Sequence, residues 1–252
     1  DVTAISLIQG TSKFVGFDNY MEIFNDPVTG RAALNTVIFT FFSILFQFII
    51  GFLIALLFNK EFPLRDFMIS LVMLPWFIPV LVSGTVFKFF FLDTGFINGL
   101  LLSLGLTSRA VPWITDSNMA IYSLTIANIW LGIPFNFIML YTGLKGIPTE
   151  LYESAEVDGA VGLKKTMYVT VPLLKPVIIT TLLLGAIFTI KVFDLVWIIT
   201  RGGPGNSSHL LSTYSYQLAF SNYNFGLGAA VSVIMILIII SLIIFIIQFS
   251  IF

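Results

Sequence analysis

The chain contains five apolar runs that are each long enough to cross a membrane. A spanning helix needs about 20 apolar residues. In hydrocarbon every backbone polar group must be paired within the protein, so only helices and closed barrels span a bilayer. Barrel strands alternate apolar and polar residues, and these runs do not, so we expect helices. The expected spans are residues 34–58, 67–91, 119–141, 177–200 and 227–252.

Composition supports a membrane protein of the all-α class. Of the 252 residues, 58% are hydrophobic and 10% are charged, whereas soluble domains carry about 25% charged residues. The net charge of −1 gives no indication of nucleic-acid binding. The absence of cysteine excludes disulfides, thiolate metal sites and cysteine nucleophiles. The single histidine, His209, cannot form a metal site alone and is expected at the surface or in a loop, so we expect neither a metal site nor catalytic residues.

The ends of the chain predict an ordered core of a longer protein. The sequence opens at the polar Asp1 without a signal-peptide pattern and ends inside an apolar run at Phe252. We expect residues 1–252 to form one transmembrane domain, in which residues 142–176 form a segment outside the bilayer.

Basic residues favour one orientation of the chain. With five spans, the connections at residues 59–66 and 142–176 share one side and hold six Lys or Arg residues, against four on the other side. The positive-inside rule therefore places these two connections and the C-terminus in the cytoplasm and the N-terminus outside. On the outer side, the apolar residues 96–106 and Trp113 indicate a short interfacial helix.

The segment at residues 142–176, called the acidic segment below, contains the stretch ELYESAEVDGAVG. A helix is expected to start with Thr149 as N-cap and to end or bend at Gly159. A second short helix is expected to end at Pro172, so that the two form a compact knob. GAVGLKKT is not a phosphate-binding loop, because Lys164 stands where the second glycine is needed. The carboxylates alone could simply form a solvated helix face.

The spacing within the acidic segment resembles the EAA motif of the permeases of binding-protein-dependent ABC importers. Glu153, Ser154 and Ala155 are followed at the family's spacing by Gly159 and by VTVP, residues 169–172. Ser154 departs mildly from the pattern, as do the valines of VTVP. The resemblance implies that this segment docks in a cleft of a cytoplasmic ATPase. The implied contact residues are Glu153, Ser154, Ala155, Asp158, Gly159 and Pro172.

Other stretches extend the resemblance over essentially the whole chain. FVGFDNY, NIWLGIPFNFIML and FDLVWIITRGGPGNSSHLLSTYSYQLAF are similar to the first permease of the carbohydrate-uptake branch, as in maltose and glycerol-phosphate systems. The family carries one further span before FVGFDNY. The resemblance implies a subunit of the bacterial cytoplasmic membrane that contacts lipid. Its implied protein partners are a second, different permease, an ATPase dimer that holds ATP and Mg, and an extracytoplasmic solute-binding protein. The chain itself is expected to bind no cofactor.

Two charges, Lys191 and Asp194, lie within the apolar run FTIKVFDLVW. Midplane charges cost about 2.5–3.5 kcal/mol each on insertion scales, so they usually face a cavity or a partner. The i, i+3 spacing predicts that they share a helix face and can pair. They form either a structural ion pair or part of the translocation path, where Lys191 would favour an anionic sugar.

A second candidate for the sugar path is the stripe of Asn128, Gly132 and Phe135, spaced i, i+4, i+7. Asn can hydrogen-bond hydroxyls, Phe can stack on a sugar, and Gly leaves room. Ordinary small-residue helix packing is the alternative. Pro134 and the prolines of MLPWFIPVL mark either simple kinks or a pathway.

The outer end of the fourth span carries TRGGPG, in which Gly202, Gly203 and Pro204 cannot continue a helix. The resemblance implies contact with the solute-binding protein, and a plain turn is the alternative. We therefore expect a sugar permease working by alternating access. An ion-coupled transporter using Lys191 and Asp194 would leave the acidic segment unexplained, and a membrane enzyme would need a catalytic cluster that the sequence lacks.

Overall fold

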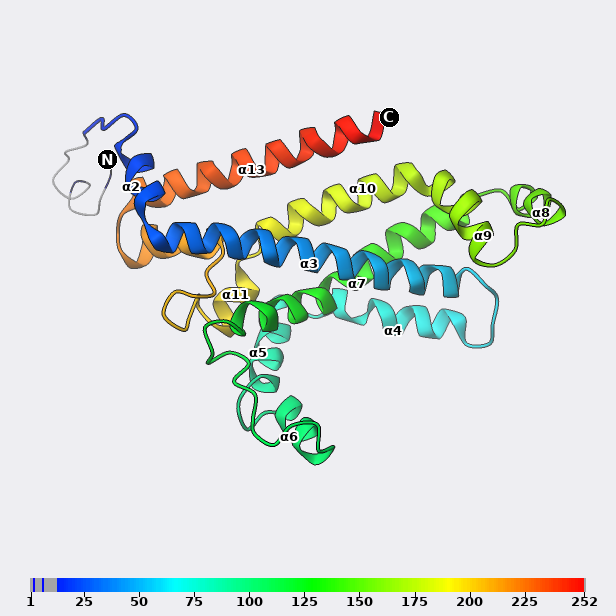
Figure 1. Ribbon diagram of the computed structural model, residues 1–252, viewed down its shortest axis with the longest axis horizontal. Helices are drawn as coiled ribbons and strands as arrows, with labels where there is room; N and C mark the ends of the chain where they lie inside the picture. The colour runs from blue at the N-terminus through cyan, green and yellow to red at the C-terminus, as the bar shows by residue number, and fades with distance from the viewer. Residues whose placement is uncertain (1, 3–5, 7–12, 252) are drawn as a thin grey trace. The chain divides into compact units, whose positions relative to one another are not determined.

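The computed structural model describes residues 2, 6 and 13–251, and the regular secondary structure of this part is helical (Figure 1). The expected position of the N-terminal end therefore falls largely outside the described residues. The helices follow in the order α2 (Asp18–Asn25), α3 (Pro27–Phe58), α4 (Arg65–Phe77), α5 (Val80–Phe90), α6 (Phe96–Ser103), α7 (Ala120–Lys145), α8 (Thr149–Val157), α9 (Leu163–Lys165), the π-helix η1 (Thr166–Thr170), α10 (Val171–Ile190), α11 (Asp194–Ile199), α12 (Leu211–Tyr216), the π-helix η2 (Gln217–Ser221) and α13 (Phe225–Ile251).

The helices contribute to two compact units, each built from three separate stretches of the chain. Unit 1 comprises Asp1–Phe42, Pro79–Asn128 and Phe188–Leu242. Unit 2 comprises Ser43–Ile78, Ile129–Ile187 and Ile243–Phe252. The long helices α3, α7, α10 and α13 each contribute residues to both units, so neither unit is a continuous piece of sequence.

Four of the five expected spans are confirmed, with different limits, because four helical stretches of the described residues are long and apolar enough to cross a membrane. The second expected span is instead the bent pair α4 and α5, interrupted at Ile78 and Pro79, which forms either one broken span or a re-entrant loop. Pro79 has no amide hydrogen and breaks the second expected helix there. The expected interfacial helix is α6, which Asn98 anchors by accepting hydrogen bonds from the amide of Val111 and the indole of Trp113.

The first span begins at Pro27, earlier than expected, because Asp26 caps it. Its carboxylate accepts hydrogen bonds from the amides of Val28 and Thr29, both at 3.0 Å. Proline suits the first helical position, where an amide hydrogen would have no partner. The hydroxyl of Tyr214 donates to the same carboxylate at 2.6 Å. Burial raises the pKa of Asp26, but these hydrogen bonds outweigh burial and leave the pKa below its usual value.

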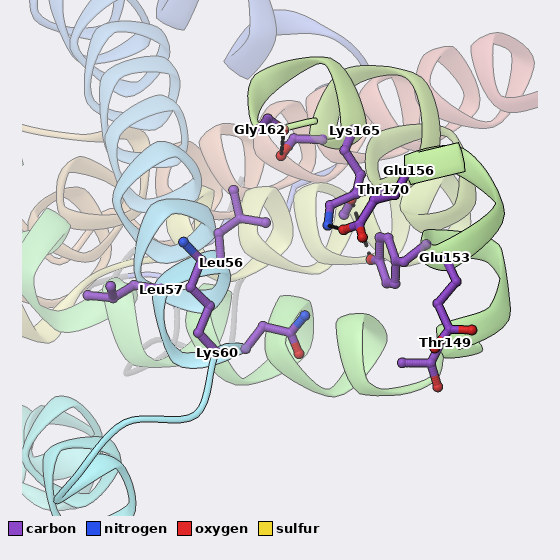
Figure 2. A pocket seen from close by; sticks show the side chains of 12 residues that line it. Leu56, Leu57, Lys60, Thr149, Glu153, Glu156, Gly162, Lys165 and Thr170 are labelled. Carbon is purple, nitrogen blue, oxygen red and sulfur yellow. Dashed lines mark hydrogen bonds and ion pairs between the residues drawn. The ribbon is translucent and has the colours of Figure 1, made fainter. Parts of the chain in front are cut away.

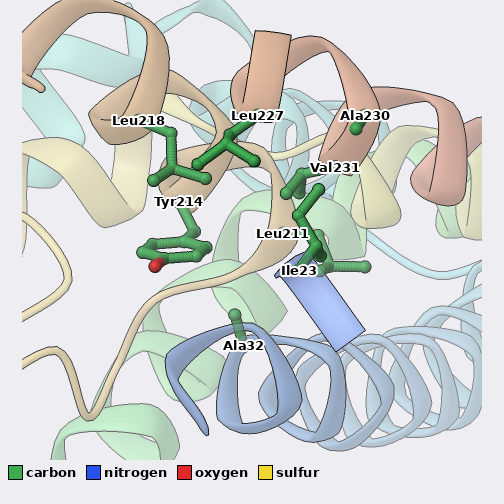
Figure 3. Packing of buried hydrophobic residues seen from close by; sticks show 8 residues of the cluster. All are labelled: Ile23, Ala32, Leu211, Tyr214, Leu218, Leu227, Ala230 and Val231. Carbon is green, nitrogen blue, oxygen red and sulfur yellow. The ribbon is translucent and has the colours of Figure 1, made fainter. Parts of the chain in front are cut away.

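The core of unit 1 joins the start of the chain to its last third (Figure 3). Gly228 lets α13 approach η2 closely, since an added Cβ would lie 2.8 Å from that of Ala219. In the same unit, α5 packs on α11, where Gly84 faces Ile198. The buried cluster consists of Ile23, Ala32, Leu211, Tyr214, Leu218, Leu227, Ala230 and Val231.

In unit 2, α3 crosses α7 at glycines. A Cβ added to Gly51 would lie 2.8 Å from Asn136 Cβ and 2.9 Å from the amide nitrogen of Phe137. Small residues let membrane helices approach this closely. The apolar core beside the crossing consists of Ala55, Phe58, Phe137, Leu140, Leu144 and Leu174.

Candidate functional site

The first helix of the acidic segment is α8, close to where the sequence places it. Its N-cap is Pro148, and Thr149 is its first helical residue, without a side-chain capping bond. The expectation that Thr149 is the N-cap is therefore wrong by one residue, because the fixed extended conformation of Pro148 already sets the helix start. None of the nine residues of α8 is buried.

Gly159 ends α8, as predicted. Its φ of +81° lies in the left-handed region, which glycine adopts without strain. The amide of Ala160 then bonds back to the carbonyl of Ala155 at 2.8 Å, a typical helix-ending contact. Nothing lies within 4 Å of the place where a Gly159 Cβ would stand. The motif residues Glu153, Ser154, Asp158 and Gly159 are exposed, and Ala155 is half-buried.

The expected end of a second short helix at Pro172 is wrong. The helical path that begins at α9 passes through η1 into α10 without a break. The amide of Val171 bonds to the carbonyl of Thr166, five residues back. This π turn widens the helix just before Pro172, so the proline is accommodated in the first turn of α10. The acidic segment is thus one exposed helix, α8, joined to the base of a long helix that enters the apolar region.

Four side chains tie α8 to α9 and η1, and sequence reasoning missed their contacts. Lys165 Nζ lies 2.5 Å from Glu156 Oε1 and 5.5 Å from the centre of the Tyr152 ring. Thr170 Oγ1 donates to the Tyr152 hydroxyl at 3.4 Å. We call Glu156, Lys165, Tyr152 and Thr170 the α8 brace. In the sequence, these contacts are indicated only by the nine-residue spacing between Glu156 and Lys165, with Gly159 and Gly162 between them.

A cavity of about 630 Å³ separates the α8 brace from the end of α3. Figure 2 shows Leu56, Leu57 and Lys60 of the α3 end on one side and Glu156 and Lys165 on the other. The complete lining is Leu56, Leu57, Asn59, Lys60, Thr149, Tyr152, Glu153, Glu156, Gly162, Lys165, Thr166 and Thr170.

The stripe of Asn128, Gly132 and Phe135 lies on α7, as expected. The space beside Gly132 is occupied, because an added Cβ would overlap the Gln47 side chain of α3. Helix packing therefore accounts for this glycine. Asn128 is buried within unit 1, and Phe135 stacks on Trp76 with ring centres 5.7 Å apart.

Lys191 and Asp194 do not share a helix face, which corrects the sequence prediction. α10 ends at Ile190 and α11 begins at Asp194, so the helix is interrupted between them. Ion pairs join Arg65 to Asp66 and Lys165 to Glu156, whereas neither Lys191 nor Asp194 forms an ion pair with a described residue. Lys191 and Asp194 are both exposed, and Lys191 Nζ lies 5.1 Å from the ring centre of Phe188. The break frees Lys191 from pairing with Asp194.

The TRGGPG turn is held in place by contacts with two buried side chains, His209 and Asn35. The imidazole of His209 fills the space under Gly202, whose φ is +82°. Asn35 of α3 donates to the carbonyls of Ser207 at 2.6 Å and His209 at 3.0 Å. Of the three expected contact residues, Gly202 is buried in this chain, whereas Gly203 and Pro204 are half-buried.

His209 lies in a connection, as expected, but is only 1% exposed. Burial lowers its pKa, and the neighbouring Gln217 side chain opposes this only in part. Its Nδ1 lies 3.0 Å from Thr213 Oγ1. The neutral imidazole is therefore the form that the folded chain holds at neutral pH.

Comparison with known proteins supports the resemblance. Residues 47–251 match the family model described as binding-protein-dependent transport system inner membrane component. The sulfoquinovosyl glycerol transport system permease protein SmoG of Agrobacterium fabrum is 34% identical over 85% of this chain and 70% of its own length. The trehalose/maltose transport system permease protein MalF of Thermococcus litoralis is 34% identical over 84% of this chain and 70% of its own.

Solved structures agree on the fold. A chain of a bacterial ABC transporter involved in import of the acidic polysaccharide alginate aligns with a TM-score of 0.85 at 24% identity, covering 98% of this chain and 89% of that one. A second alginate transporter structure, in complex with an alginate pentasaccharide-bound periplasmic protein, gives 0.83 at 25% identity, covering 96% and 85%.

Proposed function

Because this chain belongs to the family of binding-protein-dependent transport system inner membrane components, we propose that it is the subunit through which a sugar or oligosaccharide crosses the membrane. It is a multi-pass permease of an ABC importer and not an enzyme, since ATP hydrolysis resides on a separate subunit. One observation carries the sugar proposal: relatives that are 34% identical over more than four-fifths of the chain are named for sulfoquinovosyl glycerol and for trehalose and maltose.

The mechanism is alternating access driven from the acidic segment. An ATPase dimer, which holds ATP and Mg, closes on ATP and moves α8. The movement passes into α10, and the helix bundle opens toward a docked solute-binding protein; ATP hydrolysis resets it. ATP binding thus biases two arrangements of one packed transmembrane domain, residues 1–252.

The surface offered to the ATPase is the exposed face of α8. Glu153, Ser154 and Asp158 are accessible, and the open space at Gly159 lets a partner backbone approach closely. Ala155 lies between them, and Pro172 sits where the segment enters α10. The carboxylates of Glu153 and Asp158 form a solvated part of this contact surface and do not act as catalytic acids.

Lys191 is the residue that we propose favours an anionic sugar, alongside Asp194 in the path, since both are exposed. It is exposed at a helix break in an apolar segment, where an unpaired cation costs about 2.5–3.5 kcal/mol unless it faces water or a ligand. Lys191→Ala should reduce uptake of an anionic oligosaccharide more than that of a neutral one, whereas Lys88→Ala, at an exposed lysine of α5, should affect both equally. Equal losses with Lys191→Ala would contradict charge selection.

The contact with the solute-binding protein lies on the TRGGPG turn. Gly203 and Pro204 are half-buried there, and Arg201, Gly205 and Asn206 are exposed around the buried Gly202. With this contact, we propose that the turn lies outside the cell, that the acidic segment and C-terminus lie in the cytoplasm, and that the N-terminal end of this chain lies outside. The second permease is a different chain, as is usual in the carbohydrate branch.

Affinity purification of the tagged chain from its bacterial host tests the proposal. Recovery of an ATPase, a second permease and a solute-binding protein is expected. Recovery of the chain alone, together with transport by the purified chain without an ATPase, would instead support the ion-coupled mechanism.

A further inference from the structure

The connection between α8 and the helix that follows it is unsupported by packing. Gly159 and Gly162 both have positive φ, +81° and +57°, and nothing lies within 4 Å of the Cβ position of either. No residue of α8 is buried. A load applied to α8 would therefore be expected to bend the chain at these glycines, because side chains do not pack around them.

The α8 brace crosses this connection. Glu156 and Tyr152 lie on α8, and Lys165 and Thr170 lie on α9 and η1. Lys165 bonds Glu156 and lies over the Tyr152 ring, whose hydroxyl accepts from Thr170. Figure 2 shows Glu156, Lys165 and Thr170 gathered on one wall of the cavity.

We propose that Glu156, Lys165 and Tyr152 are positioning residues that hold α8 at a fixed orientation to α9 and η1, so that movement of α8 passes into α10. The inference rests on the proposed contact between α8 and the ATPase. Because α9, η1 and α10 form one helical path, fixing α8 to the start of this path fixes it to the membrane helix. Without the brace, α8 would pivot at Gly159.

The brace does not hold the fold together. The side chains of Lys165 and Glu156 are 30% and 52% exposed, and ion pairs at such sites contribute little to folding stability. Variants of these residues should therefore fold and insert normally. Their effect should appear in the orientation of α8 and in signalling between the two faces of the importer.

The chain offers a direct spectroscopic test, because it has no native cysteine. Spin labels can be attached at Glu150→Cys of α8 and Thr180→Cys of α10, both exposed positions. Pulsed electron paramagnetic resonance then measures the distance between the two helices. The braced chain should give a narrow distance distribution. Lys165→Gln and Glu156→Gln should broaden it, and Lys165→Arg should restore it. Lys164→Gln is the matched control, because Lys164 carries the same charge at an exposed position and makes no ion pair with the described residues.

The second measurement uses the complete importer purified from the host with its own binding protein. Stimulation of ATP hydrolysis by the binding protein should fall about two- to fivefold with Lys165→Gln, the range expected for loss of one exposed ion pair, and should be retained with Lys165→Arg and Lys164→Gln. An unchanged distance distribution in Lys165→Gln and Glu156→Gln would overturn the positioning role. A broadened distribution with unchanged stimulation would overturn the transmission role. If no ATPase joins the wild-type complex, the proposed function fails, and the distance measurement still decides the brace.

Discussion

The crossing of α3 and α7 predicts that Gly51→Ala destabilises the chain. Carbon atoms pack best at about 3.5–4.0 Å, whereas the new Cβ would lie 2.8 Å from Asn136 Cβ and 2.9 Å from the amide nitrogen of Phe137. The amide nitrogen belongs to the backbone and cannot rotate away, so the two helices must separate. Overpacking of this kind costs about 1–3 kcal/mol.

Gly185→Ala is the matched control, because Gly185 is also inside a membrane helix of unit 2 and nothing lies within 4 Å of its Cβ position. Both variants gain about 0.5–1 kcal/mol from the better helix former, so the difference between them isolates the clash. At about 2–4 °C per kcal/mol for a chain of this size, Gly51→Ala should melt roughly 2–12 °C below Gly185→Ala. The four tryptophans of the chain report melting in detergent by fluorescence. Equal melting temperatures would refute the close approach of the two helices.

Three further predictions concern polar contacts. Gly132→Ala should lower the melting temperature, because the added methyl group overlaps the Gln47 side chain. Adding Gln47→Ala should recover most of this loss. If the effects of the two substitutions on the melting temperature were simply additive, the overlap would be contradicted. The pKa of His209 is lowered from 6.5, so the unfolded chain takes up a proton between about pH 7.5 and 5.5 that the folded chain does not. The free energy of unfolding should therefore decrease as the pH drops through this range. His209→Gln should remove this pH dependence of the melting temperature. Tyr214→Phe should cost about 1.5–3 kcal/mol at neutral pH, and the difference from wild type should shrink as the pH falls through the lowered pKa of Asp26, below 3.8, where its carboxylate is protonated.

The spans could be predicted from the sequence because a bilayer permits few solutions to backbone pairing. Their limits could not, since they depend on contacts between distant residues. The start of α3 is fixed by Asp26, whose partner Tyr214 lies 188 residues further on. The interruption after Ile190 has no marker such as glycine or proline, so the pairing of Lys191 with Asp194 was expected in error.

The functional segment was predictable where a local motif specifies it. The EAA spacing located α8 and its end at Gly159, because a positive φ and a helix end are properties of a few consecutive residues. The α8 brace was not visible, since it forms only when α9 folds back toward α8. Helix α12 was missed for a related reason: it has six residues, and Leu211 and Tyr214 are buried in a cluster that includes the distant residues Ile23 and Ala32.

The bonds of Asn35 also constrain how the chain can be made. Its amide donates to Ser207 and His209, which lie 172 and 174 residues later in the sequence. At about 5–20 residues per second, a ribosome needs roughly 9–35 s to reach them. During that time the Asn35 side chain lacks these acceptors, so its amide is expected to bond water or another provisional partner until the last third of the protein is made.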